Sequence, residues 1–350
     1  MTTETKIGIP FILFAVIIIS VFLLYIVQRT VLSPTGDYKG NEIVVKIKRG
    51  ASLKSIAEVL QKEGVVKNSD DFIFTAKLFK CGDKLKAGKY EFSKGLSNYK
   101  ILKILIQGKT LGEKVVIPEG YTSKQIARLL QRKIGINYAD FMSLVNDRNF
   151  IRKLGINENS LEGYLYPNTY NLPWGITSKD VVKILVNEFN RKFNDSLKKN
   201  AKRKGWSVHD IVTLASIIEG EAIVDSERVV ISAVYHNRLR RRMLLQADPT
   251  IQYIIPDGPR RLLNKDLVID SPYNTYKYVG LPPGPVNNPG IKSIIAAIAP
   301  ANVPYLYFVA RGDGGHTFSR THKEHLRAKR KFDQYRREVR RKAYAKRRKG

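Results

Sequence analysis

The first pattern along the chain is an uninterrupted apolar stretch over residues 7–27, which contains no charged side chain. At about 1.5 Å per residue, a helix of this length would span about 31 Å, which matches the hydrocarbon core of a bilayer. Pro10 falls in the first turn, where its missing N–H costs little. No small-x-small cleavage site follows, so the pattern predicts an uncleaved transmembrane anchor over residues 7–27, preceded by a short segment, residues 1–6.

Beyond a turn-rich linker, residues 28–39, the alternation of apolar and polar positions repeats with an offset of 70 residues. Residues 45–50 and 115–120 each indicate a short strand that ends at a glycine turn. In both copies a Ser or Thr cap then precedes an amphipathic helix. The apolar positions of the two helices correspond: Ile56, Val59 and Leu60 in the first, and Ile126, Leu129 and Leu130 in the second.

Short elements of both kinds follow one another along the rest of the chain. Residues 72–79 and 98–107 indicate helices, and residues 86–92 indicate a strand. From 115 to 318, helices alternate with loops rich in Pro, Gly, Asn, Thr and Tyr, where binding chemistry usually lies. This mixture predicts an α+β fold rather than a doubly wound sheet. From about Arg320 onward, a helix is predicted that packs one apolar stripe and exposes its cations; the stripe is Leu326, Phe332, Tyr335 and Val339.

The net charge of +30 is unevenly placed, because residues 320–350 hold 15 Lys and Arg against 3 Asp and Glu and so carry +12 of it. A large basic surface fits nucleic acid, but no RNP, zinc-finger or basic-zipper pattern accompanies it. Anionic lipid headgroups, the carboxylates of a wall polymer, or a merely solvated basic helix explain the same excess. One lysine precedes the predicted anchor and five cations follow it, a bias that taken alone would place the large part in the cytoplasm. Because this rule is weak for long translocated domains, charge alone does not settle the orientation. The single cysteine, Cys81, is interpreted as a small buried hydrophobe.

The most informative stretch is residues 208–222, VHDIVTLASIIEGEA, which follows a plausible cap at Ser207. On a helical wheel with Ile211 at zero, Glu219 falls at about 80° and Glu221 at about 280°, both inside the apolar arc. A carboxyl group there must be paired or lose water, and the loss of water raises its pKa toward the range of a proton donor. A purely structural alternative is a helix end where one glutamate pairs with Arg228 or another cation. The pattern alone does not choose between the two glutamates or between the two roles.

Other reaction types are disfavoured by what the sequence lacks. The five histidines form no HExxH motif or other ligand set, and no Gly-x-Ser-x-Gly elbow occurs. We therefore predict no metal and no cofactor. What remains is an acid among tyrosines and amides, which are side chains suited to sugars.

Residues 214–222, LASIIEGEA, resemble the active-site helix of the YceG-like (MltG) endolytic murein transglycosylases. The resemblance runs almost from the anchor to about residue 325, through motifs at 161–170, 235–239, 245–250, 271–276, 280–285, 288–290, 304–309 and 314–318. Two positions depart from the family pattern: Asn168 replaces the usual Asp, and Gly220 stands where a longer side chain is common.

The resemblance implies that Glu219 is the catalytic acid of a carbon–oxygen lyase. The family cleaves the MurNAc–GlcNAc β-1,4 bond within peptidoglycan strands and leaves 1,6-anhydro-MurNAc ends, which would limit the length of nascent strands. One carboxyl group can first protonate the leaving oxygen and then accept the proton of the sugar's own 6-hydroxyl. Ring closure removes the need for a second carboxylate. Candidate substrate-binding residues from the matching motifs are Glu221, Gln246, Asp248, Thr250, Tyr273, Asn274, Asn288 and His316.

The resemblance also implies an organisation and a location for the chain. Residues 40–110 would form a LysM-like subdomain, 111–325 the catalytic domain and 326–350 a basic tail outside the family pattern. Residues 1–6 would be cytoplasmic and the catalytic part extracytoplasmic, anchored in the cytoplasmic membrane. Peptidoglycan strands are the expected substrate, peptidoglycan synthases are candidate partners, and no nucleic acid is expected.

Two other functions compete with this interpretation. A membrane-anchored peptidoglycan-binding protein without catalysis would use the LysM-like unit and the tyrosine-rich loops, but it would have no need for Glu219. A cytoplasmic nucleic-acid binder would use the positive charge, and a topology reporter at the C-terminus separates it from the other two.

Overall fold

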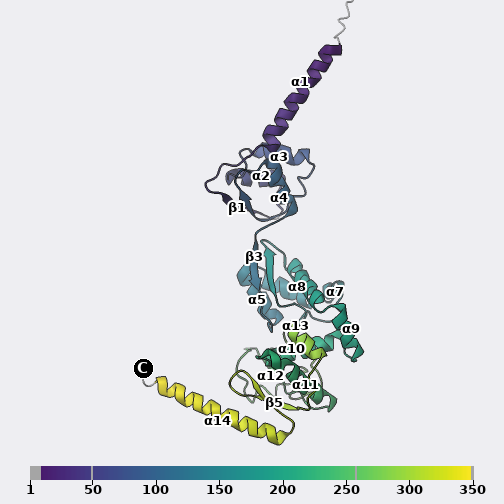
Figure 1. Ribbon diagram of the computed structural model, residues 1–350, viewed down its shortest axis with the longest axis vertical. Helices are drawn as coiled ribbons and strands as arrows, with labels where there is room; N and C mark the ends of the chain where they lie inside the picture. The colour runs from purple at the N-terminus through teal and green to yellow at the C-terminus, as the bar shows by residue number, and fades with distance from the viewer. Residues whose placement is uncertain (1–8, 49, 257, 348–350) are drawn as a thin grey trace, which may run out of the picture. The chain divides into compact units, whose positions relative to one another are not determined.

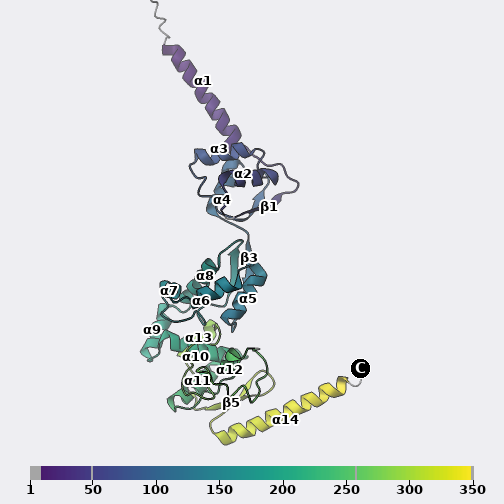
Figure 2. The same cartoon turned by 180° about the vertical axis from the view of Figure 1, so that it is seen from behind.

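The computed structural model describes residues 9–48, 50–256 and 258–347, which divide into two compact units (Figures 1 and 2). Unit 1 contains the chain as far as Lys114 and also Asn171–Ile176, while unit 2 contains Val115–Tyr170 and the chain from Thr177 onward. The division therefore falls near the predicted border at 110/111. The return of Asn171–Ile176 to unit 1 was not predicted, and it follows from strand pairing between β3 (Gly112–Val116) and β4 (Thr169–Pro173).

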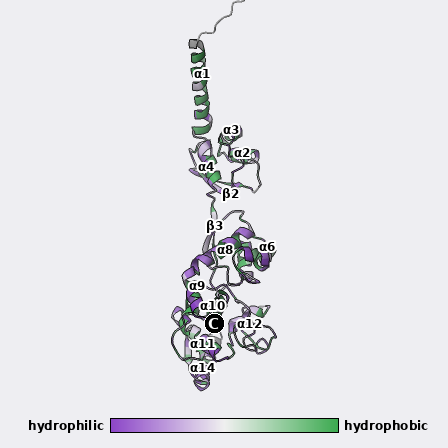
Figure 3. Cartoon of the chain, turned by 90° about the vertical axis from the view of Figure 1, so that its right-hand side faces the viewer, coloured by the Kyte–Doolittle hydropathy of each residue, from purple (hydrophilic) through white to green (hydrophobic). Residues whose placement is uncertain are grey.

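The N-terminal apolar stretch forms helix α1 (Ile9–Val27), which continues into a π-helical turn, η1 (Gln28–Leu32). Its hydrophobic colouring in Figure 3 is nearly continuous. The candidate membrane span, Ile12–Leu32, contains an 18-residue window whose mean hydropathy is 2.4 and whose residues are not buried. By length and composition this helix can cross a membrane, and a signal sequence would satisfy the same criteria. Ile7 and Gly8 of the predicted anchor lie outside the described residues.

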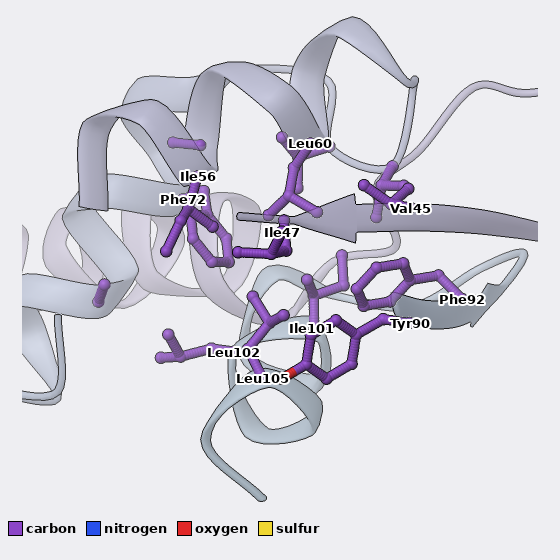
Figure 4. Packing of buried hydrophobic residues seen from close by; sticks show 14 of the residues in the cluster. Val45, Ile47, Ile56, Leu60, Phe72, Tyr90, Phe92, Ile101, Leu102 and Leu105 are labelled. Carbon is purple, nitrogen blue, oxygen red and sulfur yellow. The ribbon is translucent and has the colours of Figure 1, made fainter. Parts of the chain in front are cut away.

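The rest of unit 1 is built on an antiparallel pair of strands covered by helices. The pair runs in register from Glu42↔Ser93 to Ile47↔Gly88. Alternate strand residues, Val45, Ile47, Tyr90 and Phe92, pack against the apolar faces of the helices (Figure 4). Cys81 is buried in the same core, as predicted. The elements are β1 (Glu42–Ile47), α2 (Leu53–Lys62), α3 (Ser69–Leu78), β2 (Gly88–Ser93) and α4 (Asn98–Gln107).

The internal repeat is confirmed in structure. The first copy forms β1 and α2, and the second forms β3 and α5 (Ser123–Ile134). Ser52 caps α2, and Thr122 caps α5 in a capping box with Gln125. A glycine with φ of +76° makes the turn in each copy. The residues that each helix buries also keep the offset: Ile56, Ala57 and Leu60 in α2, and Ile126, Ala127 and Leu130 in α5.

Unit 2 is mostly helical and surrounds one buried helix, α10 (Val208–Glu221). This helix packs against α9, α11, α12 and α13. A strand pair within this unit, β5 with β6, is antiparallel from Tyr307↔Ser319 to Ala310↔His316. The remaining elements are α6 (Tyr138–Asn146), α7 (Arg148–Lys153), α8 (Ser178–Lys192), α9 (Asp195–Arg203), η2 (Asp225–Glu227), α11 (Arg228–Arg240), α12 (Asp248–Ile254), α13 (Ile291–Ile298), β5 (Tyr307–Ala310), β6 (His316–Ser319) and α14 (His322–Arg347).

The basic tail is helical, as predicted, but it does not pack an apolar stripe. Helix α14 runs unbroken through the predicted domain border at 325/326 and contacts β5 and β6. Phe332 is half-buried there, whereas Leu326, Tyr335 and Val339 are all more than 40% exposed. The predicted stripe is not buried because only the first half of α14, as far as Tyr335, lies against the β5–β6 pair. Beyond that point the helix extends away from the body of unit 2 (Figure 1).

Candidate active site

The site lies at the C-terminal end of α10. Ser207 and Asp210 form a capping box at the start of this helix, and every residue from Ile211 to Ile218 is buried. Neighbouring helices cover this stretch on all sides, so the two glutamates emerge from the core only at the last turn. Glu219 and Glu221 are therefore presented from the end of a rigid, fully packed element.

Both oxygens of the Glu219 carboxylate accept hydrogen bonds. Arg228 Nη1 donates to Oε1 at 3.0 Å, and the backbone N–H of Gly290 donates to Oε2 at 2.9 Å. Only 6% of the Glu219 side chain is exposed. The arginine comes from the first turn of α11 and the glycine from the N-terminus of α13. Three elements thus fix one carboxylate, and the pairing with Arg228 is the one that the structural alternative predicted.

Arg228 is itself held by further partners and is almost withdrawn from solvent. Its Nε donates to Asp225 at 3.1 Å, and its Nη1 also donates to the Ser293 hydroxyl at 2.6 Å. Asp225 also pairs with Lys292. Because the guanidinium is planar and bound at several points, it holds the Glu219 carboxylate in one orientation.

Glu221 has a different environment from Glu219. Its carboxyl group accepts a hydrogen bond from the Tyr235 hydroxyl at 3.1 Å. Burial, followed by the negative charge of Asp248, raises the pKa of Glu221 to about 7. The raised pKa that was expected for a carboxyl group in the apolar arc is therefore found at Glu221. The pairing with arginine is found at Glu219.

The predicted residues at 246–250 and 273–274 lie in two loops that hydrogen-bond to each other. The Gln246 N–H donates to the Thr275 carbonyl, and the Thr250 and Thr275 hydroxyls lie 3.0 Å apart. Asp248 accepts from the Tyr276 hydroxyl at 2.5 Å. Gln246 is exposed and has a φ of +48°, a conformation that non-glycine residues rarely adopt. Such strain is common at functional sites.

Several of the predicted substrate-binding side chains are buried and bonded to protein groups. Asn274 donates to the Leu267 and Ile269 carbonyls, and Thr250 donates to Ala247. His316 Nδ1 lies 2.7 Å from Glu227 on the neighbouring turn. These groups, together with Asn288, have no open face for a sugar in this structure. They hold the loops that carry the more exposed candidates, Gln246, Asp248 and the half-buried Tyr273.

Asn288 connects the turn at Gly120 and Tyr121, which borders Glu219, with the segment 162–165. Its side chain donates to the Tyr121 carbonyl and to Glu162, each at 2.9 Å, and accepts from the Leu165 N–H at 2.8 Å. Glu162 is fully buried, and this burial raises its pKa to about 7 despite hydrogen bonds from Ser123 and Asn288.

The two departures from the family pattern have local explanations. A Cβ on Gly220 would lie 2.6 Å from Cγ of Pro249, so the glycine permits close packing of α12 against α10. Asn168 donates to Glu188 at 2.9 Å, an interaction that an ionised Asp at this position could not make.

The sequence interpretation missed Glu119, whose carboxyl group lies against Gly290 beside Glu219. Partial burial and the negative charge of Glu219 raise the pKa of Glu119, while Arg228 and Lys292 act in the opposite direction. One sequence feature could have indicated Glu119: it lies in a Pro-Glu-Gly turn directly after the second repeat strand. Charged residues in such loops on a rigid scaffold often carry function.

The fold and site define a mixed α/β protein. An N-terminal apolar helix and a small unit built on a strand pair precede a mostly helical unit, which holds a carboxylate paired with arginine. Residues 45–331 match the YceG-like family, and the chain belongs to that family. A YceG-like protein of Listeria monocytogenes, known from a crystal structure, is similar in fold. The two sequences are 35% identical, and the TM-score is 0.59. The matched region comprises 82% of this chain and 99% of the Listeria chain.

Relatives with a named activity have comparable similarity. An endolytic murein transglycosylase of Bacillus subtilis is 34% identical over 324 residues, which cover 88% of this chain and 89% of the relative. One of Streptococcus pneumoniae strain D39 is 32% identical over 299 residues, covering 77% of this chain and 54% of that relative. This chain thus matches nearly the full length of the Bacillus protein and about half of the Streptococcus protein.

Proposed function

We propose that this chain is an endolytic murein transglycosylase, which cleaves MurNAc–GlcNAc β-1,4 bonds within peptidoglycan strands and so shortens nascent strands. One observation supports this most directly. In a chain whose family relatives carry that name, Glu219 occupies the end of a packed helix, with Arg228 and the Gly290 N–H fixing its orientation. Enzymes place catalytic carboxyls on rigid elements because small displacements are costly to the reaction.

In this proposal Glu219 handles the protons of the reaction. Cleavage requires a proton on the leaving GlcNAc oxygen and removal of a proton from the 6-hydroxyl of MurNAc. The 6-oxygen closes on the anomeric carbon, so the product end is a 1,6-anhydro sugar and no water is consumed. A water-activating second carboxylate, as in ordinary glycosidases, is not required.

The remaining site candidates divide by exposure. Gln246, Asp248 and Tyr273 have side-chain atoms that a glycan strand can reach, and we assign substrate contacts to them. Thr250, Asn274, Asn288 and His316 position the loops. Glu221 accepts a hydrogen bond from Tyr235, and we assign it to positioning the C-terminal end of α10 without contact to the reacting bond.

We assign glycan binding to the globular part of unit 1. Its β1–α2–α3–β2 order, with the two strands paired antiparallel, is compatible with a LysM-like subdomain. We retain residues 40–110 for this subdomain and 111–325 for the catalytic domain. Binding of purified sacculi by a full-length Glu219→Gln variant would test whether glycan is held independently of cleavage.

For location, we propose that α1 is a single-pass anchor in the cytoplasmic membrane and that both units lie outside the cytoplasm. The substrate requires this orientation, because peptidoglycan strands are assembled outside that membrane. Alkaline phosphatase fused after residue 350 should be active in the native host. Activity of a cytoplasmic reporter at the same point would overturn both the topology and the proposed function.

The activity is tested with full-length protein in detergent and purified peptidoglycan from which the stem peptides have been removed. The expected products are internal fragments whose new ends resist borohydride reduction and are lighter by one water than reducing ends. Reducible new ends would indicate hydrolysis. Binding without any new ends would support the non-catalytic peptidoglycan-binding protein instead.

A further inference from the structure

Glu119 lies in a turn that the fold holds rigidly. It follows β3 and precedes Gly120, whose φ of +76° makes the turn. The Gly120 N–H donates to the Asn288 carbonyl, and the Asn288 N–H donates to the Tyr121 carbonyl, both at 2.9 Å. These two hydrogen bonds are made by the two residues that directly follow Glu119, so they hold its turn against Asn288.

The carboxyl group of Glu119 packs directly on Gly290. A Cβ added to Gly290 would come within 1.9 Å of Glu119 Oε1 and 2.8 Å of Oε2, so only a glycine permits this approach. Gly290 has an ordinary φ of −76° and needs no glycine for its backbone conformation. The same glycine donates its N–H to Glu219 at 2.9 Å. One residue therefore separates the two carboxyl groups.

The two carboxyl groups have opposite surroundings. Glu219 is nearly buried, and both of its oxygens already accept hydrogen bonds from Arg228 and Gly290. Glu119 is exposed, so a glycan strand can reach it. The pKa of Glu119 is raised by partial burial and by the charge of Glu219. Neighbouring carboxyls whose environments differ in this way commonly divide the roles of acid and base.

We propose that Glu119 is a second catalytic residue, which donates the proton to the leaving oxygen while Glu219 accepts the proton of the 6-hydroxyl. This inference rests on the proposed transglycosylase function and refines its one-carboxyl scheme. The bond from O6 to C1 forms as the bond from C1 to the GlcNAc O4 breaks. The Glu119 proton ends on O4, and the 6-hydroxyl proton ends on Glu219. Return of one proton from Glu219 to Glu119, directly or through solvent, restores the starting state.

The proposal is tested by comparing substrates whose leaving groups do and do not need a proton. One substrate is peptide-free glycan strands, and the other is a p-nitrophenyl β-glycoside of the GlcNAc–MurNAc disaccharide, whose nitrophenolate leaves unprotonated. Glu119→Gln should slow strand cleavage on the order of a hundredfold or more while cleaving the nitrophenyl substrate near the wild-type rate. Glu219→Gln should lose both activities. Glu113→Gln, an exposed glutamate on β3, is the matched control.

Gly290→Ala gives an independent variant that leaves both carboxyls in the sequence. The added methyl group must push the Glu119 carboxyl aside, and the side-chain end can move without disturbing the fold. This variant should resemble Glu119→Gln on both substrates and should melt at the wild-type temperature. For wild type, strand cleavage should fall as rising pH removes the Glu119 proton. The residual strand cleavage by Glu119→Gln should not show this fall.

Unchanged strand cleavage by Glu119→Gln, or equal loss on both substrates in a variant that melts normally, would overturn the role of Glu119. Neither result would affect the proposed function, provided that wild type still makes anhydro ends. Failure of the wild type to make anhydro ends would instead overturn the proposed function.

Discussion

Arg228 and Glu219 form an ion pair across 3.0 Å in which both side chains are more than nine-tenths buried. A buried pair of this kind is costly to assemble, and it serves mainly to fix groups in a defined geometry. Here the geometry is that of a carboxylate at the last turn of α10, next to a second carboxyl on another segment. The pair alone fits a structural helix end as well, and the second carboxyl group beside it is what favours an active site.

Glu219→Gln is expected to abolish new chain ends while leaving the fold and sacculus binding near normal, because Gln keeps the shape but cannot accept the proton. A loss of at least a hundredfold is expected for a proton-transfer group. Glu221→Gln should retain most activity, since its partner is Tyr235. The assignment is wrong if Glu221→Gln is inactive and Glu219→Gln is active. Product analysis after borohydride reduction provides the measurement.

Arg228→Met is expected to destabilise the protein by about 3–5 kcal/mol, because it leaves the Glu219 carboxylate buried without its cation. Arg191→Met is the matched control. Arg191 pairs with Glu188 at the surface, with its own side chain 65% exposed, and such pairs contribute about 0–1 kcal/mol. Denaturant unfolding of both variants checks the difference. Adding Glu219→Gln to Arg228→Met should recover part of the loss, and equal costs for the two arginines would contradict the role assigned to the buried pair.

Stability should depend on pH through Glu162. Folding raises its pKa from 4.5 to about 7, so the folded protein holds a proton that the unfolded chain releases across this range. The contribution is fully present below the unfolded value and is lost as pH rises through the folded value. The free energy of unfolding should therefore fall from about pH 4.5 to about pH 7.

Glu162→Gln isolates this effect, because Gln mimics the protonated carboxyl and does not titrate. The variant should lose less stability between pH 5 and pH 8 than wild type, although Glu221 still titrates in the same window. Glu113→Gln should keep the wild-type dependence. Parallel curves for wild type and Glu162→Gln in chemical denaturation would refute the buried protonated state.

Local patterns were sufficient to predict many elements of the fold. The helix predicted over residues 98–107 is α4 with the same bounds, and both repeat copies form the predicted strand and helix. These features depend on apolar spacing and caps within a dozen residues. The predicted stripe on the tail failed because spacing shows which face could pack and not whether a partner surface exists.

The site was less accessible from sequence. A helical wheel places Glu219 and Glu221 equally well, and what separates them in structure is Arg228 and Gly290, which belong to other helices. Glu119 lies on a turn far earlier in the chain, and it reaches Glu219 only because Asn288 ties the two loops together. Such pairings depend on tertiary packing, so no periodicity within one segment reveals them.

The last prediction concerns the cations of α14, most of which lie beyond the residues that match the family, 45–331. We expect the helix to hold the enzyme at anionic lipid or wall polymer without taking part in the reaction. A cation near such a surface contributes about 1 kcal/mol, and screening limits its reach to about 8 Å at physiological salt. Truncation after residue 339 removes seven Lys and Arg but keeps Phe332 and Tyr335, which line a cavity between α14 and the β5–β6 pair.

The truncated enzyme should cleave a short soluble glycan at the wild-type rate. Its binding to vesicles of anionic lipid or to sacculi, measured by co-sedimentation, should be weaker than that of the full chain. Added salt should weaken the binding of the full chain more than that of the truncated chain, because salt screens the exposed cations that the truncation removes. Equal and salt-insensitive binding by the two proteins would instead identify α14 as a merely solvated basic helix. A slower rate on the soluble glycan would place the tail in the catalytic machinery and refute its separation from the reaction.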